Sequence, residues 1–279
     1  MIAGKYQLVE KIGEGAMGVV YRARHTLLGA DVAIKLLAPG RETTPDMRRR
    51  FLIEARATQA FSHRNVIAIR EVGENTDGTL FLAMDYSPGE SLRQRLNRMR
   101  RLPFEEAVSI AIQILGAIYE AHRSSIIHRD IKPANVLIEF RNGKPFARVT
   151  DFGLARVLEN AGFGAPKTSD LGPETDDGTL LGTIDYMSPE QAAGERVDAR
   201  SDIYSVGVLL YEMLTGSLPT YAEGFRKMLT AIMLQAPAPI AEVCPEANVP
   251  YEVEAIIFKA LAKQDRKSTR LNSSHGKLS

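Results

Sequence analysis

The first part of the chain, up to about residue 86, alternates apolar and polar residues in a way that predicts β-strands joined by tight turns. β-branched runs at 19–21 and 32–34 support this prediction. One helix is expected to interrupt the strands over residues 47–61, because Thr44 offers an N-cap and Pro45 suits the first helical position.

After the Ser-Pro-Gly segment at 87–89 the pattern becomes helical. Apolar residues three or four positions apart form one stripe along a helix that Pro103 can start, and they are Ala107, Ile110, Ile114, Ala117 and Ala121. A further helix over 202–214 is apolar on most faces. It is therefore expected to be a buried central helix, and Gly216 is expected to end it.

Two strands, at 136–140 and 146–150, are expected to form a hairpin whose turn contains Asn142–Gly143. Residues 162–182 contain glycines, prolines and hydroxyls without apolar periodicity, which is typical of a functional loop. The whole pattern predicts a small β-rich lobe at 1–86 and a larger helical lobe after it.

The amino-acid composition argues against some classes of function, such as binding to nucleic acid or to an anionic membrane through net charge alone. The 279 residues are 44% hydrophobic and 25% charged, which is typical of a soluble globular chain. The formal charge is +1, from 35 Lys and Arg against 34 Asp and Glu, so charge alone does not hold nucleic acid or an anionic membrane. The single cysteine, Cys244, excludes an intrachain disulfide. Without a secretory signal or an apolar run of roughly 20 residues, a cytoplasmic location is expected.

The first candidate chemistry is a Gly-x-Gly-x-x-Gly motif at Gly13, Gly15 and Gly18. Glycines at this spacing let backbone N–H groups approach phosphate oxygens. The motif alone is weak, because dinucleotide-binding turns share it. Those turns lead into a helix, whereas residues 19–23 continue as a strand, which favours a hairpin folded over a nucleotide.

A lysine ends the apolar run at 32–35. In isolation, a solvated role for Lys35 is as plausible as a ligand-binding one. Glu54 lies on the apolar side of the helix expected at 47–61. A buried ammonium needs a carboxylate partner, so we expect Lys35 to pair with Glu54 and to contact nucleotide phosphates.

The strongest signal is the segment 126–135, followed by Asp-Phe-Gly at 151–153. Asp130 offers a carboxylate that can take a hydroxyl proton, and Asn135 with Asp151 offers the oxygen ligands that Mg²⁺ prefers. Lys132 can neutralise charge on a transferred phosphoryl group. Each residue alone is more often a cap or a turn, but chance does not place all of them in this order.

Together these motifs resemble the signature set of the eukaryotic-type protein kinases, in the family's order. The resemblance covers residues 6–263, and Ser-Pro-Glu at 188–190 stands where the family usually has Ala-Pro-Glu. The loop around Asp130 looks most like that of bacterial serine/threonine kinases. The resemblance implies an α+β fold of two lobes, a small β-rich N-lobe with one main helix and a larger, mostly helical C-lobe, with ATP between them.

The resemblance also implies a set of site residues. Catalytic roles are expected for Asp130, Lys132, Lys35 and Glu54. Nucleotide contacts are expected from Ile12, Gly13, Gly15, Gly18, Val20, Ala33, Lys35, Met84, Asp85, Ser87 and Leu137. Mg²⁺, with Mn²⁺ as an alternative ion, is expected at Asn135 and Asp151. Asp202 resembles the family's buried aspartate that anchors the catalytic loop.

Lys132 and Gly182–Thr183 resemble serine/threonine kinases rather than tyrosine kinases. Regulation by loop phosphorylation is expected, because Arg129 and Arg156 can receive a phosphate through charge-assisted contacts. The candidate acceptors are Thr168, Ser169, Thr175 and Thr179, of which Thr179 is nearest the family's usual position, and Thr183 is a further regulatory candidate.

Two arginine clusters, at 48–50 and at 93–101, raise the alternative of an acidic partner or nucleic acid. They fall on expected helices and are offset by acids elsewhere. Solvated helix faces are therefore the favoured interpretation.

The end of the chain departs from the family. Residues 265–279 match what a sequencing adapter encodes, so we expect an N-lobe at 1–86, a C-lobe at 87–264 that is incomplete at its end, and a read-through tail at 265–279. The arginine that would pair with Glu190 is then absent, which predicts a buried carboxylate without its partner. A membrane anchor beyond the break remains open for the full-length protein.

The sequence therefore predicts a non-specific serine/threonine protein kinase that uses ATP and Mg²⁺ and acts on protein hydroxyls. Autophosphorylation and a kinase-domain dimer are expected among its interactions, with no nucleic acid partner and no membrane segment in this chain. Two alternatives remain, a nucleotide-binding pseudokinase that signals by conformation and a phosphotransferase that acts on small molecules.

Overall fold

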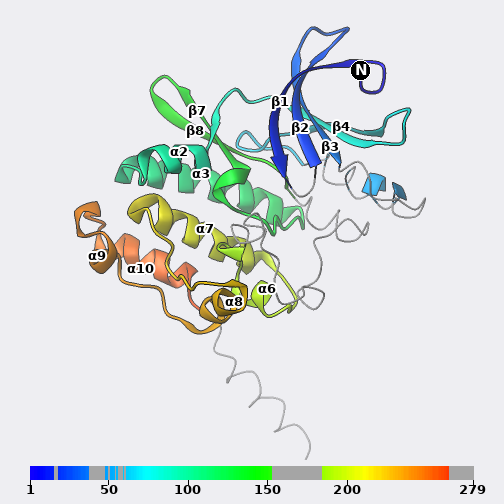
Figure 1. Ribbon diagram of the computed structural model, residues 1–279. Coiled ribbons are helices and arrows are strands. Elements are labelled where there is room, and N and C mark those ends of the chain that lie inside the picture. Colours follow the sequence, from blue (N-terminus) through cyan, green and yellow to red (C-terminus); the bar gives the residue numbers. More distant parts are fainter. Residues whose placement is uncertain are drawn as a thin grey trace, which may run out of the picture.

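The structure, a computed structural model, describes residues 1–15, 18–37, 48–49, 51–53, 55, 59, 61–152 and 184–263. Its strands gather at one end of the molecule and its helices at the other (Figure 1). The α+β fold of two lobes is confirmed. No helix in these described ranges is long and apolar enough to cross a membrane.

The small lobe is built on a five-stranded sheet with the order β1-β2-β3-β5-β4, in which every neighbouring pair is antiparallel. Its strands are β1 (Tyr6–Gly15), β2 (Gly18–His25), β3 (Asp31–Leu37), β4 (Ile69–Glu74) and β5 (Leu80–Asp85). The register places Val20 opposite Lys35 and Ala33 opposite Met84. The strands expected from the alternating pattern are present.

The helix expected over 47–61 is described at residues 48–49, 51–53, 55 and 59, all of them helical. Phe51 from this segment is fully buried and shares one apolar cluster with Ala33, Leu82 and Met84. Burial of a large aromatic side chain contributes about 2 kcal/mol or more, so this contact fixes the segment against the sheet.

A second sheet of three strands has the order β6-β7-β8, with β6 (Glu90–Ser91), β7 (Val136–Arg141) and β8 (Lys144–Val149). The expected hairpin is confirmed. Asn142 and Gly143 form its two-residue turn with φ values of 51° and 73°. Positive φ at both central residues is what a type I′ turn requires, and Asn-Gly is its favoured sequence.

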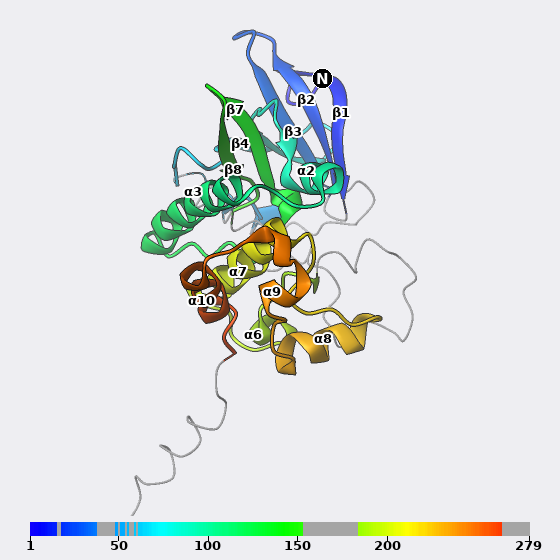
Figure 2. The ribbon, with the colours of Figure 1, turned by 90° about the vertical axis from the view of Figure 1, so that its left-hand side faces the viewer.

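The larger lobe consists mainly of helices. They are α2 (Leu92–Met99), α3 (Phe104–Arg123), α6 (Pro189–Ala192), α7 (Ala199–Thr215), α8 (Phe225–Leu234), α9 (Ile240–Val243) and α10 (Tyr251–Ala260), with short 3₁₀ turns at Pro133–Asn135 and Pro245–Ala247. In Figure 2, α3 and α7 lie between the five-stranded sheet and the group formed by α6, α8 and α9. The apolar stripe expected on α3 is buried along its whole length.

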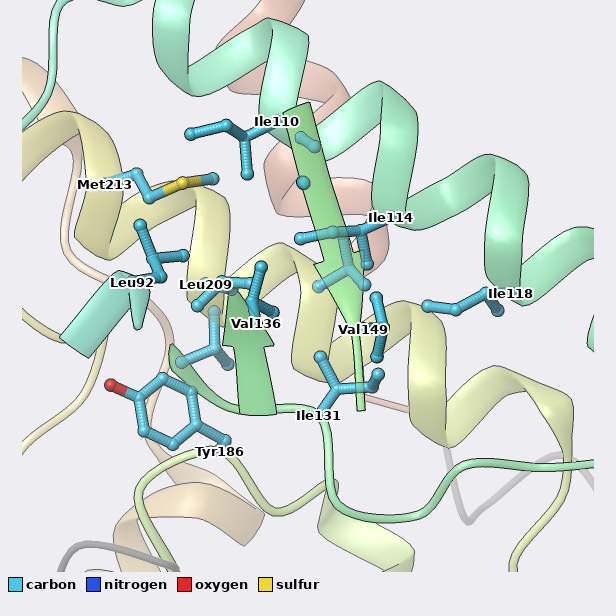
Figure 3. Packing of buried hydrophobic residues seen from close by; sticks show 14 of the residues in the cluster. Leu92, Ile110, Ile114, Ile118, Ile131, Val136, Val149, Tyr186, Leu209 and Met213 are labelled. Atoms are coloured by element: carbon cyan, nitrogen blue, oxygen red, sulfur yellow. The ribbon is translucent and has the colours of Figure 1, made fainter. Parts of the chain in front are cut away.

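Helix α7 is the buried centre of this lobe. Leu209 and Met213 of α7, Ile110 and Ile114 of α3, and Val149 of β8 converge in one core (Figure 3). The helix begins at Ala199, earlier than the expected residue 202, because Asp198 accepts a hydrogen bond from the backbone N–H of Arg200 and caps the first turn. Gly216 ends it in the left-handed conformation, as expected.

The arginines on α2 correct one expectation. The side chain of Arg95 is only 9% exposed and forms ion pairs with Glu90 and Glu106, and Arg93 bonds to Glu212. A solvated face is therefore wrong for Arg95, whereas the side chain of Arg93 is 37% exposed and is partly solvated. The expectation holds for Arg98, whose side chain is 59% exposed.

Candidate active site

The segment 126–135 follows α3 and is held in place by a buried carboxylate on α7. Asp202 is 1% exposed and accepts hydrogen bonds from the backbone N–H groups of His128, at 2.9 Å, and Arg129, at 2.8 Å. The Nε2 atom of His122 lies 2.7 Å from the same carboxylate. Asp202 thus fixes the loop to the rigid centre of the larger lobe, as the sequence predicted.

Three of the predicted site residues lie together just after this anchor. The ammonium of Lys132 is 3.0 Å from Oδ2 of Asp130. The side-chain amide of Asn135 donates to the same oxygen at 3.0 Å and to the backbone carbonyl of Asp130 at 2.8 Å. Because a lysine and an amide both hold the carboxylate, its orientation is fixed before any substrate binds.

Asp151 is joined to this group through the backbone, because the N–H of Thr150 donates to the carbonyl of Asn135 at 2.9 Å. The backbone φ of Asp151 is 64° and that of Arg129 is 69°. Two residues of the site therefore occupy the left-handed region that non-glycine residues rarely adopt. His128 fixes the segment further, since its ring bonds to the carbonyl of Thr150 and lies against Phe152 with 4.6 Å between ring centroids.

The ammonium of Lys35, on β3, lies 2.8 Å from Oδ2 of Asp151. The two side chains are 7% and 21% exposed, so water screens the pair only weakly. Burial alone would raise the pKa of Asp151, but the charge and hydrogen bond of Lys35 outweigh it and hold that pKa below its usual value. The sequence predicted Glu54 as the partner of Lys35, and Glu54 lies outside the described residues.

The glycine motif forms the end of the β1–β2 hairpin, with Gly15 opposite Gly18 and Gly13 opposite Val20. The hairpin expected from the flanking strand is therefore present. Gly18 has a φ of 137°, and a Cβ added there would lie 2.0 Å from the carbonyl oxygen of Leu36. Only glycine fits this position, whereas a Cβ at Gly15 would meet no atom of the described residues within 4 Å.

Four of the residues expected to contact the nucleotide base share one apolar cluster, namely Val20, Ala33, Met84 and Leu137. Ile12 of β1 is exposed and lies outside this cluster. Met84 also lines a small pocket together with Asp151 and Phe152. The structure therefore brings an apolar surface from both lobes next to the charged group around Asp151.

The side chains of two predicted hinge residues are already engaged. The hydroxyl of Ser87 donates to Glu139 at 2.6 Å, and the carboxylate of Asp85 bonds to Arg70 and Arg148. Because both side chains are already hydrogen-bonded within the protein, any contact of these residues with a base is expected to use their backbone atoms.

The segment around 188–190 is packed against the catalytic loop, because the side-chain amide of Gln191 donates to the carbonyl of Arg129 at 2.8 Å. Glu190 is only half-buried and accepts a hydrogen bond from the hydroxyl of Ser201. The expectation that Glu190 is fully buried is therefore wrong, and a hydroxyl bonds to it where the family pattern would place an arginine. The predicted regulatory residues Arg156, Thr179 and Thr183, and the tail at 265–279, lie outside the described residues.

Residues 6–275 match the family model described as the protein kinase domain. This chain belongs to the protein kinase family. Its curated relatives include the serine/threonine-protein kinase Pkn3 of Myxococcus xanthus, which is 39% identical over 94% of this chain and 47% of the relative. PrkC of Bacillus subtilis, also named a serine/threonine-protein kinase, is 37% identical over 94% of this chain and 38% of its own length.

Solved structures agree with the family. The kinase domain of PknI from Mycobacterium tuberculosis is 26% identical, with a TM-score of 0.68 over 95% of this chain and 90% of that one. The kinase spans less than half the length of Pkn3 and of PrkC.

Sequence reasoning missed several residues that hold this kinase site. The contact of His122 with Asp202 gives this histidine a structural role beside the catalytic loop. Gln191, Arg70 and Arg148 were assigned no role at the site. A glutamine three residues after Ser188 is the capping-box spacing, which could have drawn attention to Gln191. The two arginines belong to no local motif, because their partner Asp85 lies far from Arg148 in sequence.

Proposed function

We propose that this domain transfers the γ-phosphoryl group of ATP to serine and threonine hydroxyls of proteins. The observation that carries the proposal is the carboxylate of Asp130, held by Lys132 and Asn135 and joined through one backbone hydrogen bond to the Asp151–Lys35 pair. A protein kinase needs these groups in one place, because its catalysis is almost entirely positioning and charge stabilisation. The names of Pkn3 and PrkC support the serine/threonine class.

In this proposal Asp130 accepts a hydrogen bond from the acceptor hydroxyl, orients it toward the γ-phosphorus and takes its proton as the new P–O bond forms and the bond to the β-phosphate oxygen breaks. Lys132, which already lies beside Asp130, compensates negative charge on the transferred group. Lys35 contacts the nucleotide phosphates from β3, and the glycines of the β1–β2 hairpin offer their N–H groups to them.

The donor atoms at Asn135 and Asp151 fit a hard divalent ion. Because the amide nitrogen of Asn135 donates to Asp130, its oxygen is the atom left for a ligand, and Lys35 binds only Oδ2 of Asp151. Carboxylate and amide oxygens in small number suit Mg²⁺, with Mn²⁺ as an alternative. Such an ion would neutralise phosphate charge when the nucleotide is bound.

The remaining expectations stay proposals. A phosphate on Thr179 or Thr183 would pair with Arg129 and Arg156 and order the segment between them. Autophosphorylation, a kinase-domain dimer and protein substrates are proposed as interactions. A cytoplasmic site of action is proposed as well, since ATP and a reduced Cys244 are both expected there.

The test is the intact mass of the dephosphorylated domain after incubation with Mg²⁺ and ATP, alone and with a generic protein substrate. We expect phosphate increments for the unaltered chain and at least a 100-fold slower reaction for Asp130→Asn. Asp31→Asn, which removes an exposed carboxylate paired with Arg22 on the sheet, is the matched control and should react normally.

Nucleotide binding without any transfer would contradict the proposal and favour a pseudokinase. Transfer to small alcohols but not to proteins would favour the phosphotransferase alternative. Mapping of the increments identifies whether Thr179 or Thr183 is an acceptor.

A further inference from the structure

The carboxylate of Asp85 lies between two arginines that come from different lobes. Arg70, on β4 of the small lobe, donates through Nε to Oδ1 at 2.5 Å and through Nη2 to Oδ2 at 3.1 Å. Arg148, on β8, donates through Nη2 to Oδ2 at 3.0 Å. Asp85 is the last residue of β5 and leads into the segment that connects the lobes.

The two arginines differ in burial. The side chain of Arg70 is 62% exposed, whereas that of Arg148 is 14% exposed and that of Asp85 is 22% exposed. Arg148 also donates to the carbonyl of Val66 at 3.3 Å, but its Nε is buried without a hydrogen-bond partner among the described residues. Among the described residues, Asp85 is the carboxylate that bonds to Arg148 directly, and Glu139 on β7 lies close enough to interact with the same cation through space.

Backbone hydrogen bonds join the same two parts of the molecule beside this cluster. The N–H of Ile67 donates to the carbonyl of Val149 at 2.9 Å, and the N–H of Val149 donates to the carbonyl of Asn65 at 2.8 Å. One residue later, the carbonyl of Ala68 accepts from the N–H of Asp85 at 3.0 Å. The chain from 65 to 68 therefore lies fixed between β8 and the end of β5.

We infer that Asp85 is a positioning residue, whose carboxylate bridges Arg70 and Arg148 and holds the two lobes at a defined separation. We call this set of three residues the hinge triad. The ion pair of Asp85 with Arg148 is stronger than its pair with Arg70, because water screens a buried ion pair less than an exposed one. Since β8 ends at Val149, just before Asp151, the hinge triad also fixes the strand that leads to the proposed metal ligand.

Loss of the Asp85 charge removes the carboxylate that bonds to Arg148 and leaves this buried cation with only the more distant charge of Glu139. Such a cation is costly, and opening of the lobes relieves the cost by admitting water. The inference therefore predicts wider lobe separation and weaker retention of nucleotide. The nucleotide readout rests on the proposed function, whereas the lobe separation does not.

The first measurement is the distance distribution between spin labels on Leu27→Cys and Tyr221→Cys, at side chains that are 87% and 70% exposed, one on each lobe. Every sample carries Cys244→Ala to remove the buried native thiol. Asp85→Asn should shift the distribution to longer distances and broaden it. Asp31→Asn, on the same sheet, should leave it unchanged, and Asp85→Glu should restore most of it.

The second measurement is the Kd of a fluorescent ADP analogue with Mg²⁺, together with the KM for ATP. Asp85→Asn should raise both about 3- to 10-fold while kcat stays within about twofold, because the residue positions the lobes and leaves the reacting groups in place. Arg148→Gln should have a larger effect than Arg70→Gln, since Arg70 is solvated.

An unchanged label distance in folded Asp85→Asn overturns the hinge triad. Equal changes in Asp31→Asn overturn it as well, since they would reflect general weakening of the sheet. If the unaltered chain binds no nucleotide, the proposed function fails, and the distance measurement still decides the hinge triad.

Discussion

At the scale of single residues, this kinase site depends on charged side chains that are largely buried from solvent. Lys35 and Asp151 are the clearest pair, since both are largely buried and come from different lobes. The ammonium depresses the pKa of Asp151 in spite of burial. The carboxylate is therefore ionised at neutral pH, which the proposed metal role requires.

The first residue-scale prediction concerns Lys35→Met. Removal of the ammonium leaves Asp151 as a buried carboxylate without its cation, so we expect the free energy of unfolding at pH 7 to fall by about 3 kcal/mol. The folded-state pKa of Asp151 is depressed, so the pair stabilises fully above the ordinary carboxyl range and is lost as pH falls through the depressed value. The difference between the two chains in urea unfolding should therefore shrink as pH falls below about 4.

The matched control is Lys11→Met, which removes the ammonium of an exposed pair with Glu14. It should leave the free energy of unfolding nearly unchanged at any pH, because water screens an exposed pair. A Lys35→Met deficit that does not vary with pH would mean that Asp151 is not the group responsible.

At the scale of elements, the β1–β2 hairpin shows how closely the backbone limits substitution. Gly18 has both a positive φ and a carbonyl oxygen where a Cβ would lie, and Gly15, directly opposite, has neither restriction. Two glycines of one motif thus have different physical reasons to be glycine. Gly18 is required by the fold, and Gly15 is required, if at all, by a ligand.

We therefore expect Gly18→Ala to lower the free energy of unfolding by about 2 kcal/mol or more, through overlap with Leu36 and an unfavourable φ. Gly15→Ala should fold with a loss of about 1 kcal/mol or less but bind nucleotide more weakly. Chemical unfolding and a nucleotide titration separate the two effects. Equal loss of stability in both variants would contradict this reading of the hairpin.

At the scale of the whole molecule, helix α7 connects the core of the larger lobe to the catalytic loop through Asp202. We expect Asp202→Asn to lower kcat about 10- to 100-fold and the unfolding free energy by about 2 kcal/mol, since an amide oxygen cannot replace a carboxylate that accepts two N–H groups beside His122. Steady-state kinetics and urea unfolding measure the two quantities.

The control on the same helix is Asp198→Asn. Asparagine caps helices about as well as aspartate, so this variant should retain activity and stability. If Asp202→Asn loses stability but keeps its kcat, the carboxylate is a packing element and does not position the loop.

The features that could be predicted from the sequence are those encoded by contiguous motifs or by periodic patterns of apolar residues. The stripe on α3, the Asn142–Gly143 turn and the group around Asp130 all depend on residues close in sequence. The partners of Asp85 could not be predicted in this way, because register between distant strands brings Arg70 and Arg148 to it. The hydrogen bond to Glu190 likewise comes from Ser201 of a later helix, which no local pattern identifies.

The left-handed backbone at Arg129 and Asp151 has an evolutionary consequence. Each such residue costs about 1 kcal/mol or more, which a glycine would largely avoid. Selection for stability alone would therefore favour glycine at both positions, and it would remove the guanidinium and carboxylate that the proposed chemistry needs. This chain nevertheless has arginine and aspartate at these strained positions, so the catalytic loop is where durability and the proposed activity oppose each other most directly.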